Sequence, residues 1–265
     1  AISLHFIQNV YILSIKFGLL ACRSNNFSYL CSMIRHLANI IRGVSKYSYH
    51  IATKIVFVVL LLVDISCGRA ELLEDIIEAE NIAQEHPDRA LAIMESIDPG
   101  QLTSAKLRGH YALSYIMTQY YNELIPQSDS LSRDAVEYFA KSQDHYRRAR
   151  AYFHNGLINR AEMRVPEAML SLMEAEKSVK FVDQPRLEGL ILRAMGDIYL
   201  VNMLMPNALD IYHRSRDCFD RAGLKHHSMY GTYCIACVEA RMRNFEAAEP
   251  LLVEVRDYSL QTDSR

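Results

Sequence analysis

The stretch from Leu192 to Tyr212, LRAMGDIYLVNMLMPNALDIY, decides how this sequence folds. Its apolar residues recur at the spacing of an amphipathic helix, and a Pro-Asn pair interrupts them after Met205. Gly196 lies inside the first helical part, where glycine costs about 1 kcal/mol relative to alanine. Such a glycine has either of two uses: a loop that holds a phosphate, or a place where another helix comes very close.

Small residues recur every forty positions along the chain. They form one column of Gly156, Gly196 and Ala236, and a second column, twelve residues later, of Ala168, Ala208 and Ala248. Two antiparallel helices approach closely only where neither carries a bulky side chain, so a small residue on each helix marks their crossing. A phosphate-binding loop gives no reason for a small residue to recur forty positions away. The repeat therefore favours helix packing as the use of Gly196.

Larger residues also recur with the forty-residue period. The further columns are Val165, Met205 and Phe245; Leu172, Tyr212 and Leu252; and the turn residues Asp183, Gly223 and Asp263. Pro166 and Pro206 follow the first of these columns, and proline is well tolerated at the start of a helix. Each unit is therefore predicted to be a helical hairpin whose second helix begins at this column.

The best copy of the unit resembles the tetratricopeptide repeat. The matching residues are Leu192, Met195, Gly196 and Tyr199, followed by Ala208 and Tyr212. The period is forty residues rather than 34, and no proline ends the second helix, so the resemblance is to the superfamily and not to its short class. It implies an all-α fold, an α-solenoid of stacked antiparallel helix pairs wound into a right-handed superhelix.

The repeats divide the chain. Residues 1–66 are interpreted as a signal, a leader or a non-native extension, residues 67–70 as a short tether, and residues 71–265 as the helical repeat domain. The expected units are about 71–98, 103–141, 144–182, 184–222 and 224–262. The first two are less regular, as terminal repeats often are because one of their faces meets solvent.

Charge is distributed unevenly along the chain. The totals are 29 basic and 31 acidic residues, a formal net charge of −2. Six of the basic residues and a single acid, Asp64, precede Cys67, which leaves 23 basic and 30 acidic residues from Cys67 onward. Nonspecific nucleic-acid binding by phosphate neutralisation is not expected of such an acidic domain.

The segment before Cys67 resembles a bacterial lipoprotein signal. Lys54 precedes a nine-residue apolar run, residues 55–63, and a small residue stands directly before the cysteine. This run is too short to span a bilayer as a helix but has the length of a signal-peptide core. Cys67 is therefore a candidate lipidation site and membrane anchor. A cleaved signal, an uncleaved anchor and a non-native extension are the alternatives, and a cytoplasmic location follows if the segment is not a signal.

No constellation typical of an enzyme appears in the sequence. Phosphate-binding loops, dinucleotide fingerprints, zinc-protease motifs and nucleophile elbows are all missing. Cys234 and Cys237 have C-x-x-C spacing, but they lie in an expected helix with no second pair, so packing explains them better than redox or metal chemistry. A disulfide with Cys218 stays open. We predict no catalytic, cofactor or metal site, and no small-molecule substrate.

The remaining candidate site is the concave face, which the first helices line in tetratricopeptide proteins. We align the three units on Gly156, Gly196 and Ala236 and transfer the groove positions of that family to each unit. The corresponding residues are Arg150, Phe153, Leu157, Arg160, Leu190, Arg193, Asp197, Leu200, Tyr230, Tyr233, Cys237 and Arg241. Arginine and tyrosine are enriched in binding hot spots, and four arginines in a row would suit an acidic peptide or a C-terminal carboxylate. The alternative is that these arginines pair with neighbouring carboxylates on an ordinary solvated face.

The expected function follows from these features. It is a non-enzymatic scaffold that binds a protein or peptide, tethered to a bacterial envelope membrane. The layout resembles tetratricopeptide lipoproteins and sensor-like proteins of Bacteroides-type bacteria. The alternative is the sensor or input domain of a longer signalling or transcriptional regulator.

Overall fold

The computed structural model describes residues 70–124 and 129–263. The chain divides into two compact units, Ala1–Asp75 and Ile76–Arg265, and only residues 70–75 of the first are described. The expected leader 1–66 and the candidate lipidation site Cys67 lie outside the described residues. In the described ranges, none of the helices combines the length and the apolar composition that crossing a membrane requires.

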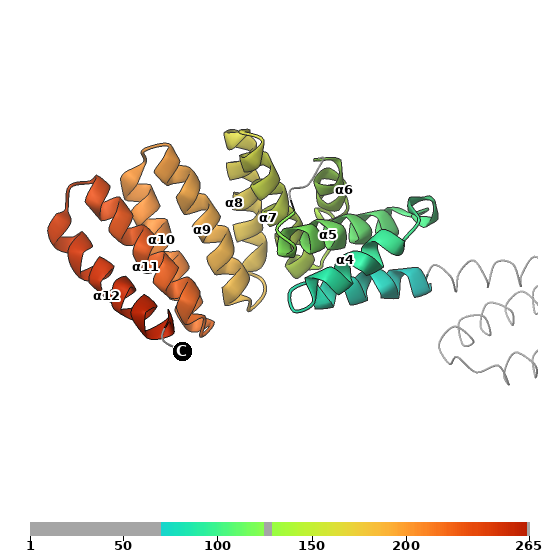
Figure 1. Ribbon diagram of the computed structural model, residues 1–265. Helices are drawn as coiled ribbons and strands as arrows, with labels where there is room; N and C mark the ends of the chain where they lie inside the picture. Colours follow the sequence, from blue (N-terminus) through green and yellow to red (C-terminus); the bar gives the residue numbers. More distant parts are fainter. Residues whose placement is uncertain (1–69, 125–128, 264–265) are drawn as a thin grey trace, which may run out of the picture. The chain divides into compact units, whose positions relative to one another are not determined.

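The described residues form helices joined by short turns (Figure 1), and they contain no strand. Residues 70–82 are helical and precede the first labelled helix. The further elements are α4 (Pro87–Ser96), the short 3-10 helix η1 (Pro99–Gln101), α5 (Ala105–Tyr121), α6 (Ser130–Phe139), α7 (His145–Ala161), α8 (Val165–Val179), α9 (Pro185–Val201), α10 (Met205–Arg221), α11 (Lys225–Arg241) and α12 (Phe245–Asp263).

Consecutive helices of the second unit pack against one another. The pairs are α5 with α6, α7 with α8, α9 with α10 and α11 with α12, and each pair contacts the next through α6 and α7, α8 and α9, and α10 and α11. The expected all-α solenoid of stacked helix pairs is confirmed. The first helix of each of these four pairs has 17 residues.

Close crossings hold the helices of a pair together. A Cβ atom added at Gly196 on α9 would lie 2.7 Å from Cε1 of Tyr212 on α10. One added at Gly156 on α7 would lie 2.8 Å from Cγ of Leu172 on α8. Contacts this short do not occur between real side chains, so a larger residue here would push the helices apart. The alanines of both columns, Ala168, Ala208, Ala236 and Ala248, are all buried.

The turns inside the pairs share one backbone conformation. Glu123, Met163, Met203 and Arg243 follow the first helices at intervals of forty and all have positive φ, between 56° and 63°. In the turn after α9, the N–H of Met203 donates to the carbonyl of Leu200, and the N–H of Leu204 donates to that of Tyr199. This pair of bonds is the Schellman motif, in which glycine is the usual left-handed residue. The solenoid therefore uses a strained residue at each of these turns.

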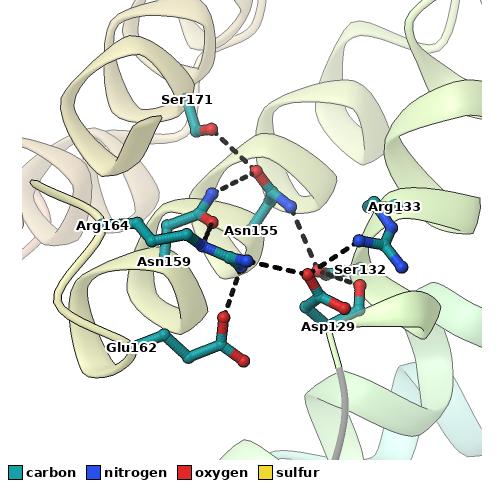
Figure 2. A network of polar contacts seen from close by, with 8 residues as sticks. All are labelled: Asp129, Ser132, Arg133, Asn155, Asn159, Glu162, Arg164 and Ser171. Atoms are coloured by element: carbon teal, nitrogen blue, oxygen red, sulfur yellow. Dashed lines mark hydrogen bonds and ion pairs between the residues drawn. The ribbon is translucent and has the colours of Figure 1, made fainter. Parts of the chain in front are cut away.

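A polar network joins the pair α5–α6 to the pair α7–α8 (Figure 2). Its members are Asp129, Ser132 and Arg133 of the α6 region, Asn155 and Asn159 of α7, Glu162 and Arg164 of the following turn, and Ser171 of α8. The Asn155 amide is its centre: the nitrogen donates to Ser132 Oγ (3.0 Å), and the oxygen accepts from Asn159 Nδ2 (2.9 Å) and Ser171 Oγ (2.7 Å). Arg164 extends the network to Asp129. Hydrogen bonds to Asn155 thus help to fix how α6 and α8 each lie on α7.

We expect Gly196→Ala to lower the free energy of unfolding by about 1–3 kcal/mol, because the added methyl group overpacks the crossing with Tyr212. Helix propensity alone would change stability in the opposite direction, by about 1 kcal/mol. Urea unfolding followed by circular dichroism measures the difference. The loss should shrink in a Tyr212→Ala background, which removes the ring. An equal loss in both backgrounds would contradict this account of the crossing.

Met203→Gly is expected to raise the free energy of unfolding by about 0.5–1 kcal/mol, since glycine adopts the left-handed conformation without strain. The Met203 side chain is 70% exposed, so its removal sacrifices little packing. Asn202→Gly is the matched control, because Asn202 has φ of −85° and gains nothing from glycine. Thermal melts of the two variants should move in opposite directions; a shared decrease would exclude strain at Met203.

Asn155→Ala should destabilise the chain by about 1–3 kcal/mol, because the buried Asn159 amide loses its acceptor. The two serine hydroxyls keep bonds to backbone carbonyls and do not add to the loss. Asn207→Ala, at an exposed position of α10, is the control, with an expected change within about 0.5 kcal/mol. Comparable losses for the two asparagines in urea unfolding would show that the network contributes no stability.

Candidate binding face of the first helices

The first helices of the last three pairs are linked side by side through polar and aromatic contacts. Arg160 of α7 forms an ion pair with Asp197 of α9 (Nη1 to Oδ2, 2.8 Å). Arg193 of α9 lies over the ring of Tyr230 of α11, 5.5 Å from its centroid. These contacts bring residues from α7, α9 and α11 onto one surface. We call the exposed or partly exposed side chains of this surface, Arg160, Arg193, Asp197, Leu200, Tyr230, Tyr233, Cys237 and Arg241, the first-helix face.

Asp197 connects this face to the helix crossing beneath it. The hydroxyl of Tyr212 donates a hydrogen bond to Asp197 Oδ1 (2.9 Å), while Arg160 binds the other oxygen. Burial raises the pKa of Tyr212, and the neighbouring Asp197 carboxylate raises it further, so the phenol keeps its proton and stays a donor. Both carboxylate oxygens of Asp197 are therefore occupied within the protein.

Two tyrosines are the most accessible aromatic residues of the face. Tyr230 and Tyr233 are 47% and 45% exposed, and their ring centroids are 6.2 Å apart. No ion pair involves Arg193 or Arg241 within residues 70–124 and 129–263, and Arg241 is exposed at the end of α11. The α9 and α11 part of the face thus presents two arginines without carboxylate partners beside two tyrosines.

The α7 part of the expected site differs from the prediction. Arg150 is bound to the buried carboxylate of Glu80 (Nη1 to Oε1, 3.3 Å) and lies over the ring of Tyr146. Nε of Arg147 donates to both oxygens of the same carboxylate, at 3.1 and 2.9 Å. With Arg160 held by Asp197, two of the four arginines are already paired. Arg150 and Arg160 therefore pair with carboxylates, as the alternative expected, but only the Arg160–Asp197 pair is partly exposed, whereas the Arg150–Glu80 pair is largely buried.

Two expected face residues are part of the hydrophobic core. Phe153 and Leu190 are buried in one cluster with Ile191 and Phe219, so neither is available to a ligand. Their assignment to the binding surface was wrong, because these positions of α7 and α9 are covered by neighbouring helices. Leu157 and Leu200 are partly buried at the edges of hydrophobic clusters.

The cysteines of the last pairs are free thiols. Cys218 and Cys234 are buried, and Cys237 is partly exposed. Burial raises the pKa of the Cys234 thiol to about 12, which is the opposite of the lowered pKa of a reactive cysteine. In the described part of the chain, no three His, Cys, Asp or Glu side chains are grouped so that they could hold one metal ion.

Sequence reasoning did not find Glu80 or the buried histidines. Glu80 lies in an acidic helical segment whose sequence is typical of a solvent-exposed helix. Only its ion pair with Arg147 of α7, 67 residues away, shows that it links two helices. Burial lowers the pKa of His154 to about 3 and that of His110 to about 4, so both rings are neutral near pH 7. No local pattern distinguishes these residues from exposed ones.

Comparison with known proteins supports the fold. No family model and no curated protein matches the chain. Among solved structures it resembles the nearly identical TPR-like repeats of a proposed kinesin light chain from Podosopora anserina, at 15% identity and a TM-score of 0.54, over 73% of this chain and 97% of that one. A variant of that protein gives 14% identity and a TM-score of 0.55, over 74% and 98%.

A third solved structure places the same fold inside a larger protein. It is a signal-transduction ATPase with numerous domains from Pyrococcus horikoshii, which has a tetratricopeptide repeat sensor. The match has 14% identity and a TM-score of 0.57, and it covers 92% of this chain but 40% of the other. At these identities the likeness concerns the fold: the chain has a tetratricopeptide-like repeat structure.

Proposed function

We propose that this chain is a non-enzymatic scaffold that binds a protein or peptide on its first-helix face. The observation that carries the proposal is the exposed pair Tyr230 and Tyr233 beside Arg193. Tyrosine and arginine dominate binding hot spots, because each combines a large contact area with hydrogen-bonding groups. The tetratricopeptide-like fold supports the same function, since stacked repeats offer an extended surface.

The charge of this surface favours an acidic ligand. Arg193 and Arg241 have no ion-pair partner in the described residues, whereas the carboxylate of Asp197 is occupied by Arg160 and Tyr212. A peptide carboxylate near Arg193 would meet an arginine whose guanidinium group is already oriented by the Tyr230 ring. The ligand class we propose is therefore an acidic segment or a C-terminal carboxylate, bound across α9 and α11.

The place of action is proposed from the N-terminal sequence. A lipid on Cys67 would hold the repeat domain at an envelope membrane through the short tether 67–70. Intact-mass analysis of protein extracted from native membranes tests this separately from binding. A mass equal to that of a diacylated chain beginning at Cys67 supports the tether, and an unmodified Cys67 excludes it.

A sensor domain is the second candidate. The solved ATPase, whose match covers 92% of the present chain, has a tetratricopeptide repeat sensor, so the same fold serves as an input module there. In that case the first-helix face would bind the signal. Sequencing the gene beyond the codon for Arg265 separates the candidates, because a sensor needs an output domain on the same chain.

The binding test uses the Arg193→Ala/Tyr233→Ala double variant. Ligands that co-purify with the full chain from native envelopes are identified, and their dissociation constants are measured by calorimetry with synthetic segments. We expect at least about a tenfold loss of affinity, the scale of a hot-spot substitution. Lower affinity at higher salt should accompany the role of the arginines.

Leu170→Ala is the matched control, because Leu170 is exposed on α8, a second helix. It should bind as the unaltered chain does. Unchanged affinity in the double variant would exclude the first-helix face as the binding surface. Equal losses in the double variant and in Leu170→Ala would exclude it as well.

A further inference from the structure

The hydroxyl group of Tyr212 is not needed for the packing of its helix pair. Tyr212 belongs to a column that recurs every forty residues, and the other members are Leu172 and Leu252. Leu172 is fully buried against Gly156, just as the Tyr212 ring is buried at its own crossing. An apolar side chain therefore closes such a crossing without a hydroxyl. What distinguishes the pair of α9 and α10 is a buried hydroxyl that donates to Asp197.

Arg193 and Asp197 lie four residues apart on α9, which places their side chains next to each other on one face of the helix. Opposite charges at this spacing attract each other. In the described residues, however, the only ion pair of Asp197 is with Arg160 of α7, and Arg193 lies over the Tyr230 ring instead. A separate interaction therefore keeps the neighbouring carboxylate from Arg193.

Two hydrogen bonds hold the Asp197 carboxylate in place. Tyr212 of α10 donates to Oδ1 (2.9 Å), and Nη1 of Arg160 of α7 donates to Oδ2 (2.8 Å). Because the two donors come from different helices, together they fix the orientation of the carboxylate. Tyr212 is 1% exposed, whereas the Arg160 side chain is 40% exposed. The tyrosine bond is therefore the better shielded from water, and exposed ion pairs hold their partners only weakly.

This arrangement occurs in one of the three aligned units. The equivalent positions of the other two units carry neither an arginine nor a carboxylate: they are Leu157 and Cys237 for the aspartate, and Phe153 and Tyr233 for the arginine. The hydroxyl in the Tyr212 column thus occurs in the unit that has an arginine and a carboxylate side by side.

We propose that Tyr212 is a positioning residue of the first-helix face: its hydroxyl holds Asp197 away from Arg193 and so keeps that arginine available to a ligand carboxylate. Without this bond, Oδ1 of Asp197 is released and the carboxylate turns to Arg193, where it takes the place of the ligand. Asp197 is then an internal competitor of an acidic ligand. For the ligand, this inference rests on the proposed function, whereas the pairing of Arg193 does not depend on it.

Tyr212→Phe tests the proposal, because it removes the hydroxyl and keeps the ring that packs against Gly196. The full chain is treated with phenylglyoxal, which reacts with guanidinium groups, and the reaction rate at Arg193 is measured by peptide mass mapping. We expect this rate to fall about twofold to fivefold, the range that corresponds to a partly exposed ion pair. Arg241, which also has no ion-pair partner in the described residues, is the internal reference, and its rate should stay constant.

Two further variants separate the carboxylate from other effects of losing a hydroxyl. Tyr199→Phe removes a hydroxyl from the same helix pair but leaves both hydrogen bonds of Asp197 intact, so Arg193 should react as in the unaltered chain. Asp197→Asn removes the competing charge, so adding Tyr212→Phe in that background should not change the rate at Arg193. An Arg193 rate that does not fall in Tyr212→Phe overturns the proposal, and so does an equal fall in the Asp197→Asn background.

Calorimetry with an acetylated hexapeptide of glutamate connects the inference to the proposed function. Tyr212→Phe should bind this peptide about twofold to fivefold more weakly than the unaltered chain, and Asp197→Asn should bind it equally well with and without Tyr212→Phe. If the unaltered chain does not bind the peptide, the acidic ligand class is excluded, while the labelling of Arg193 still decides the role of Tyr212. If the unaltered chain and Tyr212→Phe bind it with equal affinity, that role is excluded.

Discussion

The close contact between Gly196 and the ring of Tyr212 sets the geometry on which the rest of the repeat domain depends. Since a Cβ atom at Gly196 would collide with that ring, the distance between α9 and α10 is fixed by the absence of a side chain. The same contact directs the Tyr212 hydroxyl to Asp197, the next residue of α9. Asp197 in turn holds Arg160 of the preceding pair. One crossing therefore positions a pair and links it to its neighbour.

The interfaces between pairs change character along the chain. Toward the N-terminus they contain buried charge and amide groups: Glu80 bound by Arg147 and Arg150, and the network centred on Asn155. Toward the C-terminus they are mainly apolar, as in the cluster of Tyr212, Ile235 and Val238. A shift of one helix pair along its neighbour would separate the partners of a buried ion pair and leave an uncompensated charge. The polar interfaces therefore tolerate fewer such shifts than the apolar ones. Arg150 is bound by Glu80 and Arg160 by Asp197, so the arginines of the first-helix face without a carboxylate partner in the described residues are on α9 and α11.

The fold could be predicted from the sequence because its information is local and repeated. Gly156, Gly196 and Ala236 mark the crossings at constant spacing, and α8, α10 and α12 begin at the predicted column of Val165, Met205 and Phe245. The site was less predictable. The position of Phe153 within the repeat cannot by itself show that its side chain is buried, because its exposure depends on how closely adjacent pairs stack. Nor can the position of Arg150 show that it meets a carboxylate 70 residues away.

At the left-handed turns of this chain, the backbone conformation does not depend on which residue occupies the position. Glutamate, methionine and arginine all occupy the same strained position at intervals of forty, so the conformation is imposed by the Schellman hydrogen bonds and the helix packing rather than by the residue type. Because the repeat supplies the conformation, these side chains are free to serve the surface. At Met163 and Met203 the side chain is largely exposed, so neither the backbone conformation nor core packing sets the residue type at these turns.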